Sequence, residues 1–365
     1  MIYKKIIRPI LFKFDPEKIH HFVVKCLGLV SRISFLEAFL ERMLFVNHKY
    51  LHVKVGALEF KNPIGLAAGF DKYIDAPLSY PMLGFGFAEL GSITYSPQSG
   101  NPKPRMWRLP KDQGLIVNYG LSNDGAKKTK ERIVKKIKHR KIPYGVSIAP
   151  TTGLLEKDLV DDYLNSFLEL YDVADYIVLN VSCPNVVNIG ISAQLNFIEN
   201  LLQKIYNLKS EKQIKKDIFI KIGPEMKNDE IDSLVDICLE NKITGIIATN
   251  LCKKRENLPN CKTASKILEN SGSVSGALIR EMSNRTISRI YQKSQGKLVI
   301  IGVGGVFSAQ DAYRKIRLGA SLVQNITGFI YEGPIAIRNI NKGLIKLLKN
   351  DGYESIGEVV GKDIF

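Results

Sequence analysis

The sequence predicts an α/β protein in which a (β/α)8 TIM barrel follows a small N-terminal helical subdomain. Short apolar runs recur along the chain, helix-like stretches lie between most of them, and polar residues follow the runs at their downstream ends. Near-continuous apolar runs are typical of strands buried on both faces of a parallel sheet, and eight such units favour a barrel over an open sheet. We place the subdomain at residues 1–47 and the barrel at residues 48–365.

The N-terminal segment begins its helical pattern at Asp15-Pro16-Glu17, where Asp15 suits an N-cap and Pro16 the first helical position. Apolar residues then recur at helical spacing over residues 20–46, with Lys and Arg on the other faces. The pattern predicts two short amphipathic helices. Such a pair either lies in a membrane interface or packs on the main domain as a cap, and this pattern leaves both open.

The barrel elements follow in chain order, after a small hairpin expected within residues 51–60. The predicted strands are residues 64–68, 87–93, 144–148, 176–181, 218–222, 245–248, 298–303 and 321–323. The clearest intervening helical stretches are residues 195–208, 229–240, 279–293 and 309–318.

The composition bounds the function. The 365 residues are 45% hydrophobic and include five Cys without a C-x-x-C pair, which argues against a disulfide framework or a zinc site, so we expect no metal and a reducing compartment. No apolar run approaches the ~20 residues of a membrane span, and a signal peptide is not apparent. The net charge of +16 favours an anionic partner, but the basic cluster at residues 127–138 suits a solvated helix face. Because aromatic residues do not alternate with these charges, we expect no nucleic-acid partner.

Polar residues at the strand ends predict one shared site. Gly69 and Lys72 follow the first strand, Ser92 lies at the end of the second, and Thr249 and Asn250 follow the sixth. These ends meet on the active-site face of a barrel. After the fourth strand, Cys183 lies between Asn180 and Asn185, and the alternative for this thiol is a structural core cysteine.

The last two strands predict a phosphate site. Gly302-Val-Gly304-Gly305 follows the seventh strand, and Thr327-Gly328 follows the eighth. Glycines allow backbone amides to approach an anion, and these loops form the usual phosphate site of the fold. A phosphorylated cofactor would fit, with Lys221 reaching its ring.

These motifs resemble the dihydroorotate dehydrogenases, and most closely their membrane-associated, quinone-linked class 2. The matching segments are Phe12-x-x-Asp15-Pro16-Glu17-x-x-His20, Asn62-Pro63-x-Gly65-Leu66-Ala67-Ala68-Gly69-Phe-Asp71-Lys72, Lys103-Pro104-Arg105, Ala248-Thr249-Asn250, Ser275-Gly276, Gly302-Val-Gly304-Gly305 and Gly319-Ala-Ser-Leu-Val-Gln324. The resemblance implies FMN-dependent oxidation of (S)-dihydroorotate to orotate in de novo pyrimidine biosynthesis, with a membrane quinone as acceptor.

The resemblance also implies roles for individual residues. Cys183 would be the catalytic base, and the substrate would contact Lys72, Asn118, Asn180, Asn185 and Asn250. The FMN contacts would be Ala67, Ala68, Gly69, Lys72, Ser92, Ser147, Asn180, Lys221, Thr249, Gly276, Gly304, Gly305, Ile326 and Thr327. His20 and Arg105 would lie near the quinone. The N-terminal helices would hold the protein peripherally on the cytoplasmic side of the inner membrane.

Several positions depart from the class 2 pattern. Cys183 replaces the class 2 Ser base with the residue used by class 1, and Ser147 replaces an Asn at the flavin. Val117 and Leu251 replace polar substrate contacts, with Asn118 as a possible substitute for the first, and Ile326 replaces a Tyr. The alternatives are therefore a flavin oxidoreductase for another dihydropyrimidine or small heterocycle, and a flavin-binding paralogue without activity.

Overall fold

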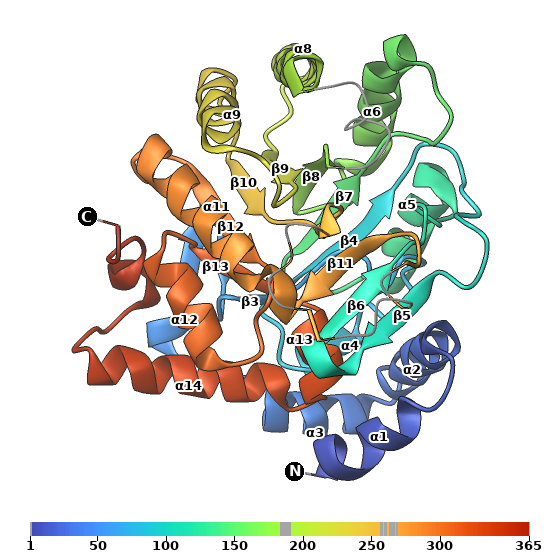
Figure 1. The fold of residues 1–365 in the computed structure, drawn as a ribbon, viewed down its shortest axis with the longest axis vertical. Helices are drawn as coiled ribbons and strands as arrows, with labels where there is room; N and C mark the ends of the chain where they lie inside the picture. The colour runs from blue at the N-terminus through green and yellow to red at the C-terminus, as the bar shows by residue number, and fades with distance from the viewer. Residues whose placement is uncertain are drawn as a thin grey trace.

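The chain forms a closed barrel of parallel strands that follow one another in chain order, with β13 pairing back onto β3. The computed structural model describes residues 2–182, 191–255, 258, 261–262, 267 and 269–364, and within these residues the barrel has the eight predicted strands (Figure 1). They are β3 (Ile64–Leu66), β4 (Phe87–Ile93), β7 (Tyr144–Ile148), β8 (Tyr176–Asn180), β9 (Asp217–Ile222), β10 (Gly245–Ala248), β12 (Val299–Val303) and β13 (Leu322–Asn325).

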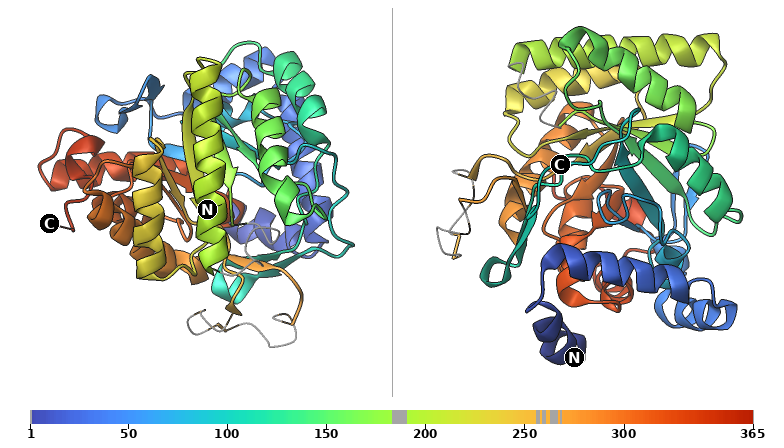
Figure 2. Two further views of the ribbon diagram at one scale, coloured as in Figure 1. Left: turned by 90° about the horizontal axis from the view of Figure 1, so that it is seen from above. Right: turned by 90° about the vertical axis from the view of Figure 1, so that its right-hand side faces the viewer.

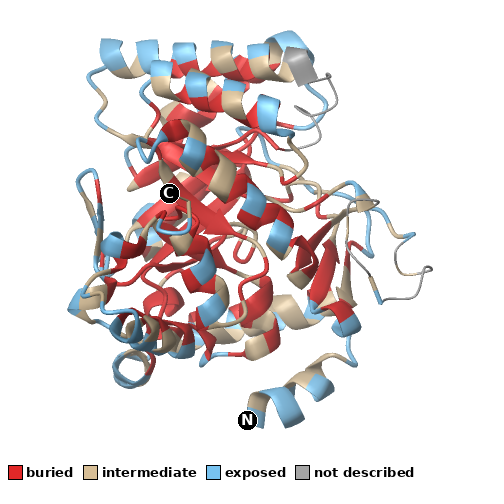
Figure 3. Ribbon diagram, turned by 60° about the vertical axis from the view of Figure 1, so that its left-hand side comes forward, coloured by how far each residue is buried: buried red, intermediate tan, exposed pale blue. Residues whose placement is uncertain are grey.

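The strands are apolar throughout because both of their faces are buried. On β8, Val178 points into the barrel core with Phe219 of β9, while Ile177 and Leu179 pack in the layer between strands and helices. Figure 3 shows the resulting buried centre, with exposed residues on the outer faces of the helices. The register pairs Asn180 with Lys221, which places the polar ends of two neighbouring strands side by side.

Helices surround the barrel, as the spacing of apolar residues predicts (Figure 2). Each of the four clearest predicted helices is confirmed within about two to four residues at its ends, the usual uncertainty of such boundaries. On α12, Ser308 accepts a hydrogen bond from the Asp311 amide at 3.2 Å, and Asp311 returns one, forming a capping box. The helices are α4 (Ser79–Met82), α5 (Gly125–Lys136), α6 (Glu156–Leu170), α8 (Ile191–Glu211), α9 (Asn228–Glu240), α11 (Arg280–Ser294), α12 (Ala309–Arg317), α13 (Thr327–Glu332) and α14 (Ala336–Asn350).

Two small antiparallel sheets cover the ends of the barrel. The predicted hairpin, β1 (Val53–Val55) and β2 (Leu58–Phe60), closes the amino-terminal end, where the ring of Phe60 contacts Phe87 at a centroid distance of 5.3 Å. A sheet that the sequence analysis does not predict lies at the other end (Figure 1). It consists of β5 (Met106–Leu109), β6 (Gly114–Val117) and β11 (Ser273–Gly276) in the order β11-β6-β5.

The N-terminal segment contains the two predicted amphipathic helices, α2 (Pro16–Val30) and α3 (Ser34–Leu44), after a further helical stretch, η1 (Tyr3–Ile7) and α1 (Arg8–Leu11). As predicted, Asp15 caps α2 by accepting a hydrogen bond from the Lys18 amide at 2.8 Å. Helix α2 lies close to the barrel, because a Cβ at Gly28 would meet the Asp75 carbonyl at 2.8 Å. None of the described helices is both long and apolar enough to span a bilayer.

The outer face of this segment keeps large apolar side chains in solvent. Phe35 on α3 is 81% exposed. The other exposed apolar residues of the segment are Ile2, Ile6, Ile7, Ile10, Phe14, Phe22, Leu29, Ile33, Phe39 and Met43. The helices therefore pack on the barrel through one face and present an apolar face outward.

Candidate active site

A cavity opens at the carboxyl ends of the barrel strands, the face that carries active sites in this fold. It occupies about 900 Å³ including its open mouth, within the range of small-molecule sites. Lys221 of β9 and Thr249 after β10 form part of its wall, and Val117 of β6 and Gly276 of β11 close it from the opposite side. The unpredicted sheet is thus the roof of the site.

Most residues predicted to bind the cofactor line this cavity. They are Ala67, Ala68, Gly69, Lys72, Lys221, Thr249, Gly276, Gly304, Gly305, Ile326 and Thr327, and the predicted substrate residue Asn250 joins them. Ser92, Ser147 and Asn180 do not line it. Cys183 and Asn185 lie outside the described residues.

A chain of hydrogen bonds connects those three predicted residues to the cavity. Ser92 and Ser147 share a hydrogen bond of 2.8 Å, and the Asn180 amide donates to Ser92 Oγ at 2.9 Å. Ser182 donates to Asn180 Oδ1 at 2.9 Å, and the Asn250 amide in turn donates to Ser182 Oγ at 2.6 Å. The chain fixes which way the Asn250 amide faces, and orientation is what an amide needs to discriminate between donors and acceptors on a ligand.

Lys221 has an anionic partner that the sequence analysis did not single out. Its Nζ lies 3.0 Å from Oε1 of Glu89 on β4, and both side chains are buried. Gln324 of β13 donates to the other carboxylate oxygen at 2.6 Å. A buried charge is costly unless it is paired and hydrogen-bonded. A carboxylate within the otherwise apolar run of residues 87–93 was therefore a signal that a cation lies opposite.

Lys72 reaches into the cavity beside an aromatic ring. Its Nζ donates to the Gly69 carbonyl at 2.6 Å and lies 3.7 Å from the centroid of the Tyr119 ring. Burial lowers the pKa of Lys72 to about 8, with Asp71 raising it and Arg105 lowering it. Tyr119 was also missed, because an aromatic residue next to a glycine has no distinctive pattern in the sequence.

The glycines after β12 form a cradle for an anion. Gly304 and Gly305 have φ angles of +118° and +70°, which favour glycine. A Cβ at Gly305 would lie 2.4 Å from Cβ of Arg280, and the Arg280 side chain donates to the Gly305 carbonyl at 2.7 Å. Nearby, the buried hydroxyl of Thr249 has no hydrogen-bond partner among the described residues. Both features suit a polar, phosphorylated ligand.

A second, largely apolar cavity of about 1060 Å³ lies between the N-terminal helices and the barrel. Its lining comes from η1, α1 and α2 on one side and from β5, β6 and α13 on the other. Five residues belong to the walls of both cavities, so the two adjoin: His20, Phe70, Met106, Leu115 and Ile330.

Of the two residues predicted near a quinone, only His20 lines these cavities. Burial, with the nearby Lys72 and His21 charges, lowers the pKa of His20 to about 3, so the imidazole is neutral. Arg105 lines neither cavity, because its guanidinium is held by Glu17 at 2.9 Å. Arg108 of β5 lines the second cavity instead, and donates to the Phe14 carbonyl at 2.7 Å.

The departures from the family pattern lie at the active-site cavity. Val117, Leu251 and Ile326 all line it. Asn118 does not: its Oδ1 accepts a hydrogen bond from Asn101 at 2.9 Å. Strand β6 places consecutive side chains on opposite faces, which explains why Val117 faces the cavity and Asn118 faces away.

Comparisons with known proteins agree with this geometry. The sequence model of the dihydroorotate dehydrogenase family matches residues 50–348. Proteins named dihydroorotate dehydrogenase (quinone) from Trichodesmium erythraeum and Nostoc punctiforme are 38% and 39% identical, over 99% and 100% of this chain and 98% of each relative. The crystal structure of DHODH from Eimeria tenella in complex with ferulenol has a TM-score of 0.81 at 30% identity, covering 96% of both chains. The chain therefore belongs to the dihydroorotate dehydrogenase family, and within it to the quinone-linked class 2.

Proposed function

We propose that this protein oxidises (S)-dihydroorotate to orotate for de novo pyrimidine biosynthesis, with FMN as cofactor and a membrane quinone as electron acceptor. The observation that carries the proposal is the pairing, in one cavity, of Lys72 and the oriented Asn250 amide with the glycine cradle after β12. Membership of the family and the printed names of the relatives support the same activity.

The residues present fit FMN. The cradle at Gly304 and Gly305 suits a phosphate, and the unpartnered Thr249 hydroxyl suits a polar ring atom. Lys221 and the backbone at Ala68 and Gly69 would hold the ring system. When bound, FMN supplies a two-electron acceptor that passes its electrons to the quinone.

The chain's own residues would bind the substrate and move one proton. The Lys72 ammonium would pair with the substrate carboxylate, and the Asn250 amide would hydrogen-bond the ring, which carries both N–H and C=O groups. Cys183 Sγ would take the proton from the ring carbon next to a carbonyl, as hydride leaves the neighbouring carbon. A thiol, with an ordinary pKa of about 8.5, loses its proton more readily than the class 2 serine hydroxyl.

We assign quinone access to the N-terminal subdomain, residues 1–47. The second cavity lies under α1 and α2 and reaches the first through His20 and Phe70. The exposed apolar side chains of α3, above all Phe35, with Lys and Arg around them, suit a peripheral position on a membrane surface. We assign the protein to the cytoplasmic side of the inner membrane.

The test is anaerobic mixing of the purified flavoprotein with dihydroorotate, followed by addition of a short-chain quinone. The visible flavin absorbance should bleach and then return. Cys183→Ala should bleach far more slowly, whereas Cys183→Ser, which restores the class 2 base, should retain part of the rate. A wild-type flavin that dihydroorotate leaves oxidised would contradict the proposal.

A second candidate, oxidation of a different dihydropyrimidine or small heterocycle, is favoured by one observation. Val117 and Leu251 line the cavity where the family has polar contacts to the substrate. This alternative predicts that a dihydropyrimidine without a carboxylate bleaches the flavin faster than dihydroorotate does in the same anaerobic experiment.

A further inference from the structure

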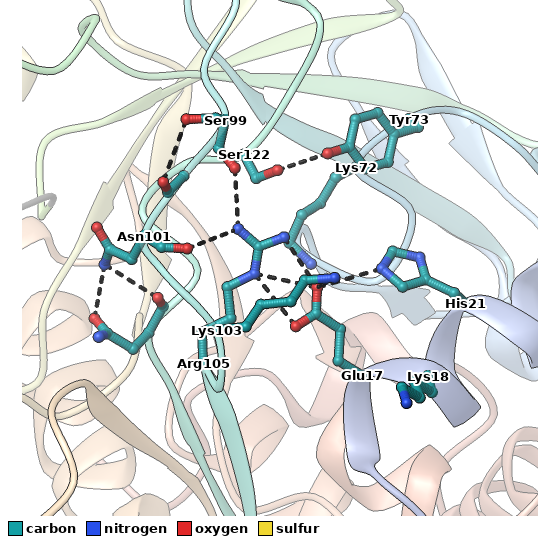
Figure 4. Close-up of polar contacts among 12 residues, drawn as sticks. Glu17, Lys18, His21, Lys72, Tyr73, Ser99, Asn101, Lys103, Arg105 and Ser122 are labelled. Atoms are coloured by element: carbon teal, nitrogen blue, oxygen red, sulfur yellow. Dashed lines mark hydrogen bonds and ion pairs between the residues drawn. The ribbon is translucent and has the colours of Figure 1, made fainter.

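A buried carboxylate from the N-terminal segment reaches toward the substrate pocket (Figure 4). Glu17, the second residue of α2, is 4% exposed and accepts three hydrogen bonds from Arg105: from Nε at 3.1 Å to Oε1 and 3.3 Å to Oε2, and from Nη2 at 2.9 Å. Burial alone would raise the pKa of Glu17, but Arg105, Lys103 and His21 outweigh it and lower the pKa. Glu17 is thus a stable anion at neutral pH.

Arg105 carries this charge to the pocket. Its guanidinium lies 4.8 Å from the centroid of the Tyr119 ring, the same ring that the Lys72 ammonium contacts at 3.7 Å. Two cations therefore share one aromatic side chain, and Glu17 supplies the compensating negative charge. Backbone carbonyls of Ser99 and Asn101 accept from Arg105 Nη1 at 3.0 and 3.1 Å, so the arginine is fixed in this position.

We propose that Glu17 is a positioning residue of the substrate pocket: by neutralising Arg105, it lets Lys72 remain a cation beside Tyr119, ready to bind an anionic ring substrate. The N-terminal helix is then an electrostatic part of the active site as well as a cover for the second cavity. The substrate named in the tests rests on the proposed function, but the state of Lys72 does not.

The sign of the effect follows from the groups that face Lys72. Burial lowers its pKa to about 8, Asp71 and Glu17 raise it, and Arg105 lowers it. Losing Glu17 leaves Arg105 uncompensated and should lower the pKa of Lys72 further. Losing Arg105 should raise it. The charged and titratable groups facing Lys72 are Asp71 on its own segment, Glu17 and the neutral His20 from α2, Arg105 before β5, and Tyr119 after β6.

The experiment compares Glu17→Gln, Arg105→Met and the double variant. In the ligand-free protein, the ¹³Cε signal of Lys72, assigned by its loss in Lys72→Arg, is followed from about pH 6 to about pH 10. The titration midpoint should fall by about half a pH unit or more in Glu17→Gln, rise in Arg105→Met, and return close to the wild-type value in the double variant. Glu37→Gln, which breaks a 2.8 Å ion pair between α3 and Lys141, is the matched control and should leave the midpoint unchanged.

Orotate affinity gives the functional readout. The dissociation constant should begin to rise with pH at a lower pH in Glu17→Gln than in the wild type, because the cation that pairs with the carboxylate is lost earlier. Equal Lys72 midpoints in Glu17→Gln and the wild type, or a double variant no closer to wild type than Glu17→Gln, would overturn the inference and indicate a merely structural contact. A wild type that does not bind orotate would count against the proposed function alone, since the Lys72 titration is measured without it.

Discussion

The ammonium group of Lys221 and the carboxylate of Glu89 lie 3.0 Å apart inside the barrel, directly below the active-site cavity. Removing one partner of a buried ion pair leaves an uncompensated charge. Glu89→Ala should therefore lower the free energy of unfolding in urea by about 3–5 kcal/mol. Glu59→Ala, at an exposed position on β2, is the control and should change it by less than about 0.5 kcal/mol. Similar losses in the two variants would contradict this account.

The cavity wall predicts a gain of function. Val117→Asn restores an amide where Val117 now faces the site. A new hydrogen bond to a polar ligand contributes about 1–1.5 kcal/mol, so orotate should bind about tenfold more tightly. The measurement is a titration of the flavin spectrum with orotate, and Val134→Asn, on the exposed face of α5, is the control. Unchanged or weaker binding would favour the second candidate substrate.

The unpartnered hydroxyl of Thr249 predicts a contribution to cofactor affinity. Thr249→Val keeps the side-chain shape but removes the hydroxyl, and should weaken FMN binding to the stripped protein by about fivefold, or about 1 kcal/mol. Thr249→Ser keeps the hydroxyl and should bind nearly as tightly as the wild type. Fluorescence titration with FMN measures both. An unaltered affinity in Thr249→Val would mean that the hydroxyl makes no contact with the cofactor.

His20 predicts a pH dependence of stability. Its pKa of about 3 in the folded protein lies below the value of about 6.5 expected in the unfolded chain. Below that value the unfolded chain binds a proton that the folded protein does not, so stability falls as pH falls from about 7 toward 4. The unfolding free energy of His20→Gln should lose less over this range than that of the wild type. His139→Gln controls for loss of an imidazole, and parallel curves for wild type and His20→Gln would refute the prediction.

The exposed apolar face of α3 predicts membrane binding. Phe35→Asp places a charge at the most exposed large apolar residue of the segment. Burial of a Phe side chain contributes about 1.5–3 kcal/mol, so binding to anionic lipid vesicles should fall by about tenfold or more in a flotation assay. Val134→Asp, on the exposed face of α5, should bind as the wild type does. Equal flotation of both variants would remove Phe35 from the membrane contact.

The barrel could be predicted from the sequence because its strands are buried on both faces and each ends in polar residues. The roof sheet could not: Val274 pairs with Ile116, and strands of four residues carry too weak a pattern to reveal a partner so far along the chain. Side-chain direction at the roof was also hidden, so Asn118 looked equivalent to Val117 although it faces Asn101. Glu89 and Glu17 were missed because each partner lies on a distant element.

The shared wall between the two cavities separates the routes for reductant and oxidant. His20, Phe70, Met106, Leu115 and Ile330 stand between an opening at the strand ends and one under the N-terminal helices. With two doorways, a molecule lodged in the outer chamber blocks the exit of electrons without hindering their arrival. Such an inhibitor would be uncompetitive or noncompetitive toward the pyrimidine, and the protein would collect in its colourless form.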